Sequence, residues 1–107
     1  MTETKIKVLV AEDEAHLGQI LSNFLSGRGY AVSTVTDGRA ALDTLRAEAF
    51  DVALLDIVMP ELDGLEVLKQ VRADVDPPEV IIITGNGTIE TAISAMKLGA
   101  YDYMSKP

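Results

Sequence analysis

The apolar residues of this 107-residue chain gather in five short runs, separated by longer stretches in which apolar positions recur at helical spacing. The runs are Ile6–Ala11, Tyr30–Val35, Asp51–Asp56, Glu79–Thr84 and Ala100–Met104. The first, third and fourth are almost continuous in Val, Ile, Leu and Ala, as expected of parallel strands buried on both faces. The second run is more mixed, which favours an edge strand.

Four amphipathic helices are predicted between these strands, because apolar residues recur three or four positions apart. The stripes are Leu17, Ile20, Leu21, Phe24 and Leu25; Ala41, Leu42 and Leu45; Leu65, Leu68 and Val71; and Ile89, Ala92, Ile93 and Met96. The expected boundaries are Gly27 and Gly29 after the first helix, Asp37-Gly38 before the second, Pro77-Pro78 after the third, and Thr88 and Gly99 around the fourth. We interpret all four stripes as core packing.

The strict alternation of strands and helices predicts an α/β domain with a parallel sheet and right-handed crossovers. It ends on a strand, so four helices have to cover both faces of a five-stranded, doubly wound sheet. We therefore expect part of one face to lack a helix, over the last strands. A single domain spanning residues 1–107 fits this length.

Composition and charge exclude several kinds of function. The net charge of −8 disfavours a nucleic-acid surface in this segment. There is no cysteine, which excludes disulfides, thiolate metal sites and cysteine nucleophiles. No signal-peptide core or membrane-spanning run is present in the sequence, so we expect a cytoplasmic protein that does not bind membranes.

Chemically active side chains follow the predicted strands at their carboxyl ends, which meet in one crevice in an open α/β sheet. Glu12 and Asp13 follow the first strand, Asp56 ends the third, and Thr84 ends the fourth. Lys106 follows the fifth. Three carboxylates at close quarters repel one another, and a dication such as Mg²⁺ relieves this repulsion.

Each of these residues also has a simpler interpretation. Glu12-Asp13 fits a helix cap, with Asp13 as the N-cap residue. Thr84, before Gly85-Asn86-Gly87, fits an ordinary turn, and Lys106 fits a solvated charge near a chain end. Asp56 differs, because a carboxylate at the end of an apolar strand is costly unless it is paired. The single histidine, His16, lies beside the first helical stripe and is expected at the surface.

Taken together, the spacing resembles the receiver domain of bacterial two-component response regulators, and the resemblance covers the whole chain. It rests on Glu12-Asp13, Asp56 with Met59-Pro60 and Asp63-Gly64, Thr84-Gly85, and Tyr103 before Lys106-Pro107. The segment from Thr84 to Pro107 further resembles receivers of the NtrC type, which serve transcriptional activators.

The resemblance implies a flavodoxin-like fold with strand order 2-1-3-4-5, the order of the chemotaxis receiver. It implies that a sensor histidine kinase phosphorylates Asp56, and that Thr84 and Lys106 bind the phosphoryl oxygens. It also implies Mg²⁺, or alternatively Mn²⁺, held by Asp13, Asp56 and the Val58 backbone carbonyl, with Glu12 acting largely through water.

The resemblance further makes Thr84 and Tyr103 a switch pair that biases the fourth helix and fifth strand. At Val58 and Asn86, receiver domains vary in ways that influence the lifetime of the acyl phosphate. Because an apolar Val58 cannot position a water molecule by hydrogen bonding, we expect slow self-hydrolysis, with a half-life longer than seconds.

The chain departs from the family after Lys106-Pro107, where receivers continue into a fifth helix. We therefore expect a truncated receiver without its C-terminal effector domain, and self-association or domain swapping through the exposed apolar face. Two rival functions remain open. One is a phosphorylation-independent interaction module on the same fold. The other is an aspartate-nucleophile phosphatase of the haloacid-dehalogenase type. Val58 argues against this function, because it occupies the position at which that family needs a second acid.

Overall fold

A five-stranded parallel sheet forms the centre of the computed structural model, which describes residues 5–85 and 89–106. The elements are β1 (Lys7–Ala11), α1 (Ala15–Gly27), β2 (Ala31–Val35), α2 (Gly38–Ala47), β3 (Val52–Asp56), α3 (Gly64–Arg72), β4 (Glu79–Thr84), α4 (Ile89–Lys97) and β5 (Asp102–Ser105). The strand order β2-β1-β3-β4-β5 confirms the predicted flavodoxin-like topology, with β2 at an edge.

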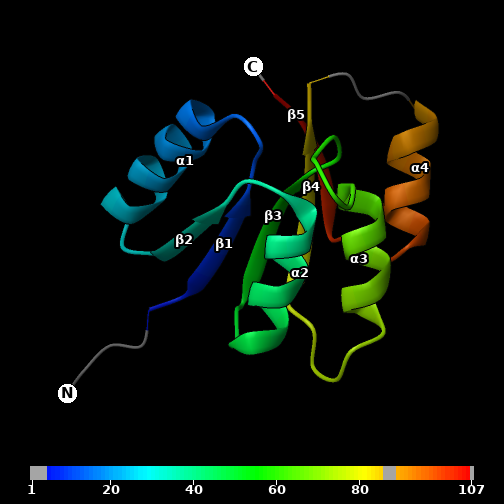
Figure 1. Cartoon of the computed structure of the whole chain (residues 1–107), viewed down its shortest axis with the longest axis horizontal. Coiled ribbons are helices and arrows are strands. Elements are labelled where there is room, and N and C mark those ends of the chain that lie inside the picture. Colours follow the sequence, from blue (N-terminus) through cyan, green and yellow to red (C-terminus); the bar gives the residue numbers. More distant parts are fainter. Residues whose placement is uncertain (1–4, 86–88, 107) are drawn as a thin grey trace.

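The two faces of the sheet are covered unequally. Helices α2, α3 and α4 share one face, whereas α1 lies over β1 and β2 at one end of the sheet (Figure 1). The principal core cluster contains residues from β1, β3 and β4, such as Leu9, Leu55 and Ile82, together with residues of α2, α3 and α4. It contains no residue of α1, so this helix packs against the opposite face.

The interpretation of all four helical stripes as core packing was wrong for α1 and α4. On α1, Ile20 and Phe24 are 50% and 56% exposed, and Gly18 is the fully buried position. On α4, Ile89 is 80% exposed, while Ala95 is buried in the core cluster. Helix α4 packs through Ala95, whereas α1 packs through Gly18 and the half-buried Leu17, Leu21 and Leu25. Among the described residues, no further element covers the exposed apolar side chains of the two helices.

Local signals set most element boundaries as the sequence predicts. The Asp37 side chain accepts a hydrogen bond from the Ala40 amide at 2.7 Å, and it caps α2 immediately before Gly38. Gly99, with φ near 100°, follows α4 in the left-handed conformation that favours glycine. The expected N-cap at Thr88 lies outside the described residues.

The fifth strand begins later than the sequence suggests. The Ala100 amide donates to the Ala95 carbonyl at 3.0 Å, which makes Ala100 part of the turn that ends α4. The strand therefore runs from Asp102 to Ser105 instead of starting at Ala100.

Strand register aligns the residues that follow each strand. Ala11 pairs with Leu55, so the next residues, Glu12 and Asp56, lie at the same level. Asp56 pairs with Ile83, and Thr84 pairs with Ser105, which places Lys106 just beyond them. Because strand side chains alternate between faces, Glu12 and Asp56 share the α1 face, while Thr84 and Tyr103 face α4.

None of the helices in the described part of the chain has the length and apolar content needed to cross a bilayer.

We expect a polypeptide of these 107 residues to self-associate through its α1 face, where Phe24 and Met104 are half-exposed and apolar. Replacing Phe24 by Gln should lower the weight-average mass seen in sedimentation velocity at high protein concentration. Replacing Ile89 by Gln, on the opposite face, should leave it unchanged. A monomer at high concentration with one cooperative melting transition would contradict this expectation.

Candidate functional site

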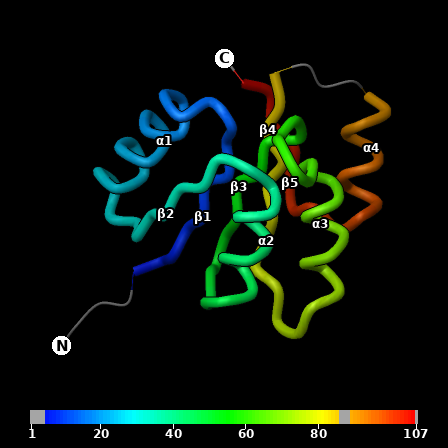
Figure 2. Tube along the Cα trace, in the orientation of Figure 1, coloured from blue at the N-terminus to red at the C-terminus, as the bar shows by residue number. Residues whose placement is uncertain are grey.

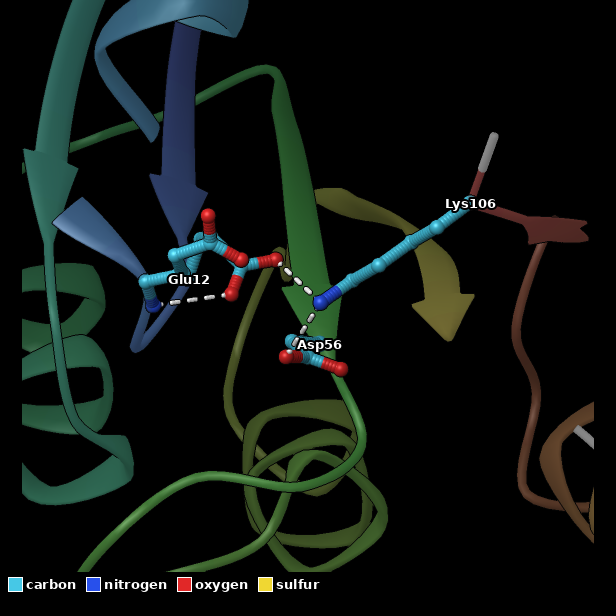
Figure 3. Close-up of polar contacts among 4 residues, drawn as sticks. Glu12, Asp56 and Lys106 are labelled. Atoms are coloured by element: carbon cyan, nitrogen blue, oxygen red, sulfur yellow. Dashed lines mark hydrogen bonds and ion pairs between the residues drawn. The ribbon is translucent and has the colours of Figure 1, made fainter. Parts of the chain in front are cut away.

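The predicted acids and lysine meet at the carboxyl edge of the sheet. Glu12 follows β1, Asp56 ends β3, and Lys106 reaches from beyond β5 into the space between them (Figure 3). Three separate strands thus supply one cluster. All three side chains are largely withdrawn from water, since that of Lys106 is 19% exposed and those of Glu12 and Asp56 are 0% and 4%.

The Lys106 ammonium pairs with two carboxylates at once. Its Nζ lies 2.6 Å from Glu12 Oε1 and donates to Asp56 Oδ2 at 2.9 Å. The Lys106 backbone amide donates to the Thr84 carbonyl at 2.8 Å, which continues the β4–β5 pairing past the end of the strand. The backbone of Lys106 is therefore fixed by the sheet, and its side chain compensates the two most buried acids.

Glu12 is bound at both carboxylate oxygens. Oε2 accepts from the backbone amide of Glu14 at 3.0 Å. Oε1 is buried and has no hydrogen-bonded partner besides the Lys106 ammonium among the described residues. A buried carboxylate oxygen that depends on one shared cation can accept a second cation.

Burial raises the pKa of Glu12 above its ordinary 4.5. The Lys106 ammonium and the Glu14 amide act in the opposite direction, and the neighbouring Asp13 and Asp56 add to the increase. For Lys106, burial pulls the pKa down, but pairing with Glu12 and Asp56 outweighs it and raises the pKa above 10.5. Burial thus favours the protonated form of Glu12, and pairing with the two acids favours the charged form of Lys106.

Glu12, Asp13 and Asp56 form a candidate metal centre. One carboxylate oxygen from each lies within 4.8 Å of the others, and Asp13 is exposed while the other two are buried. Oxygen-only ligands with one side open to solvent suit a hard divalent cation that retains water. The donor chemistry therefore fits the ion that the sequence predicts.

A solvent-accessible pocket of about 230 Å³ opens beside these acids. It is lined by Asp13, Asp56, Val58, Thr84, Gly85 and Lys106. A Cβ atom at Gly85 would lie 3.7 Å from Lys106 Cδ, so this glycine lies directly beside the lysine side chain. The pocket has room for a tetrahedral anion with carboxylate, hydroxyl and ammonium groups around it.

The simpler interpretation of Asp13 as a helix cap is wrong. Glu14 is the N-cap residue of α1, and no side chain caps it through a hydrogen bond. Asp13 instead lines the pocket, and the Glu12 side chain accepts the hydrogen bond from the Glu14 amide. His16 is exposed, as expected.

The two residues expected to act as a switch lie on the α4 side of the sheet. Tyr103 is half-buried against the core cluster, and its hydroxyl is 3.1 Å from Thr91 Oγ1 on α4. Thr84 is buried at the end of β4. Thr91 could not be singled out from the sequence, because no local pattern indicates a hydroxyl pair between residues twelve positions apart. Asn86 and Gly87 lie outside the described residues.

The family model for the response regulator receiver domain matches residues 8–107. The chain belongs to this family. Receiver domains are signalling domains and not classical enzymes.

The chain is similar to known receiver-containing proteins in both sequence and structure. The transcriptional regulatory protein ZraR of Escherichia coli (strain K12), of the NtrC type, is 40% identical over 107 residues, covering 100% of this chain and 24% of ZraR. A CheY-like receiver domain protein from Methanospirillum hungatei JF-1 has a TM-score of 0.93 at 25% identity, covering 97% of this chain and 83% of that one.

A response regulator protein from Burkholderia pseudomallei, solved with a phosphorylated aspartic acid, calcium ion and citrate, has a TM-score of 0.90 at 29% identity. The match covers 96% of this chain and 61% of that one. Among curated relatives, the transcriptional regulators ZraR and FixJ are matched over 24% and 51% of their lengths.

The raised pKa of Glu12 predicts how the stability of this receiver domain depends on pH. Between pH 4.5 and the higher folded-state pKa, the folded state holds more protons than the unfolded state, so Glu12's contribution to stability falls as pH rises. Without divalent metal, Glu12→Gln should therefore have a higher free energy of unfolding than the natural chain at pH 8.

Urea denaturation at pH 5 and pH 8 in chelator measures this effect. Glu79 is exposed, so Glu79→Gln is the matched control. Its free energy of unfolding should equal that of the natural chain at both pH values. If Glu12→Gln is less stable than the natural chain at pH 8, the carboxylate is stabilising and the account of its burial is wrong.

Proposed function

We propose that this receiver domain accepts a phosphoryl group on Asp56 from a phosphohistidine of a sensor histidine kinase, in a Mg²⁺-dependent reaction. The modified domain then controls a downstream, transcriptional output. The observation that carries the proposal is the Lys106 ammonium, 2.9 Å from Asp56 Oδ2 and beside a pocket of about 230 Å³. The phosphorylated aspartate of the similar Burkholderia protein supports it.

The transfer balances without further reactants. An Asp56 carboxylate oxygen bonds to phosphorus as the phosphorus–nitrogen bond of the phosphohistidine breaks, and the histidine keeps the electron pair. Asp13, Asp56 and the Val58 backbone carbonyl would hold Mg²⁺, with Glu12 acting through water, and a bound Mg²⁺ would supply positive charge against the negative charge of the transferred group. Formally, three carboxylates are balanced by one dication and the Lys106 ammonium.

Lys106 and Thr84 then bind the phosphoryl oxygens. The ammonium already lies at the pocket wall, so it exchanges its Asp56 contact for a phosphoryl oxygen without a large movement. Thr84 lines the same pocket and closes the strand next to β3. Positioning and charge stabilisation are the main requirements of phosphoryl transfer, and these side chains supply both.

The response to phosphorylation passes to α4. As Thr84 moves toward the phosphoryl group, Tyr103 turns inward, and this turn breaks its contact with Thr91 on α4. A local charge change thereby biases the packing of one helix against β5. The effector that reads this change belongs to the proposed full-length regulator.

Intact mass spectrometry after treatment with a small phosphodonor and Mg²⁺ tests the proposal. We expect one phosphoryl adduct on the natural chain and none on Asp56→Asn. Asp43→Asn, an exposed aspartate on α2, is the matched control and should retain the adduct. Absence of an adduct on the natural chain would favour a phosphorylation-independent interaction module instead.

A further inference from the structure

The loop between β3 and α3, residues 57–63, carries the Val58 carbonyl and directly follows Asp56. The conformation of this loop sets the direction of the Val58 carbonyl and of Asp56. Contacts that hold the loop in place therefore also hold the proposed metal-binding groups. Two glycines contact this loop, one at its own end and one on α2.

Gly64 closes the loop locally. Its amide donates to the Ile57 carbonyl at 2.8 Å, and a Cβ atom there would lie 2.2 Å from the Asp56 carbonyl oxygen. Asp63-Gly64 belongs to the sequence pattern by which this chain resembles receiver domains.

Gly38, the first residue of α2, holds the same loop from outside. Its amide donates to the Pro60 carbonyl at 3.0 Å. A Cβ atom on Gly38 would lie 1.8 Å from the Leu62 carbonyl oxygen and 2.7 Å from Leu62 Cβ. Figure 2 shows the start of α2 beside the loop that leads into α3. No side chain larger than hydrogen fits this contact unless the backbone moves.

The loop is tightly folded at the point of contact. The Pro60 carbonyl accepts from both the Gly38 and the Leu62 amides, at 3.0 and 2.9 Å. Between Pro60 and Leu62, Glu61 has φ of 72°, a left-handed conformation that is unfavourable for a residue with a side chain. Such a conformation persists only where the surroundings enforce it, and the Gly38 contact supplies that constraint.

We infer that Gly38 is a positioning residue for the phosphorylation site. By allowing α2 to pack directly on the loop, it fixes the direction of the Val58 carbonyl beside Asp56. The inference rests on the proposed function, because it assigns Gly38 a role in holding the metal-binding groups. Gly38 lies outside the pocket and acts through the loop backbone.

Gly38→Ala tests this role, with two matched controls. Gly27→Ala adds the same methyl group at the end of α1, where nothing lies within 4 Å. Asp37→Ala removes the cap of the same helix end without pushing on the loop. We expect Gly38→Ala to weaken Mg²⁺ binding by about tenfold, as changes to groups that orient metal ligands do. Both controls should bind Mg²⁺ as the natural chain does.

Mg²⁺ titrations followed by backbone amide NMR shifts, together with urea denaturation of each variant, give the two readouts. A purely structural role predicts that Asp37→Ala and Gly38→Ala lose Mg²⁺ affinity in proportion to their loss of stability, and that result would overturn the inference. Equal affinity of Gly38→Ala and Gly27→Ala would also overturn it.

A measurement on the natural chain covers the case in which Gly38→Ala does not fold. During the Mg²⁺ titration, the Gly38 amide shift should follow the same binding curve as the Val58 amide, and the Gly27 amide should not move. A Gly38 amide that does not respond would contradict the inference. If the natural chain binds Mg²⁺ but takes no phosphoryl group, the proposed function fails while the role of Gly38 in metal binding stands.

Discussion

The arrangement of this domain depends on one constraint: two buried carboxylates from adjacent strands share a single ammonium. Glu12 and Asp56 lie at one level because β1 and β3 pair in register, and burying two carboxylates there is costly unless a cation pairs with them. Lys106 provides that cation from the far side of β4. The site is consequently a product of sheet topology, since no two of its three charges come from the same strand.

The same constraint links the site to the rest of the fold. The loop after Asp56 is held between Gly64 and α2, so the backbone beside the acids is fixed from both ends. Thr84 lines the pocket from the other face of the sheet, where the Tyr103 hydroxyl lies 3.1 Å from Thr91 Oγ1 on α4. In the proposed function, the paired charges of Glu12, Asp56 and Lys106 lie on the α1 face, and the response to phosphorylation passes to the α4 face.

The sequence predicted what local pattern and topology control. The alternation of strands and helices and the convergence of Glu12, Asp13 and Asp56 follow from periodicity and from the rule that strand ends meet. The strand order follows from the resemblance to receiver domains. Lys106 as a single residue resembled a solvated charge, because its placement depends on the non-local pairing of Thr84 with Ser105. The exposed stripes on α1 and α4 were misjudged because helical spacing shows that a face is apolar but not whether another element covers it. The Gly38 contact was missed because it depends on how closely α2 approaches a loop more than twenty residues away.

The most direct test of the shared-cation account is the free energy of unfolding of Lys106→Met, measured at pH 8 with and without Mg²⁺. The account predicts a loss of about 2 kcal/mol in chelator, smaller than for a fully buried pair because the lysine is partly exposed. It also predicts that Mg²⁺ stabilises the variant more than the natural chain, because the ion then meets three acids without a competing ammonium. A variant as stable as the natural chain in chelator, with an equal gain from Mg²⁺, would contradict the account.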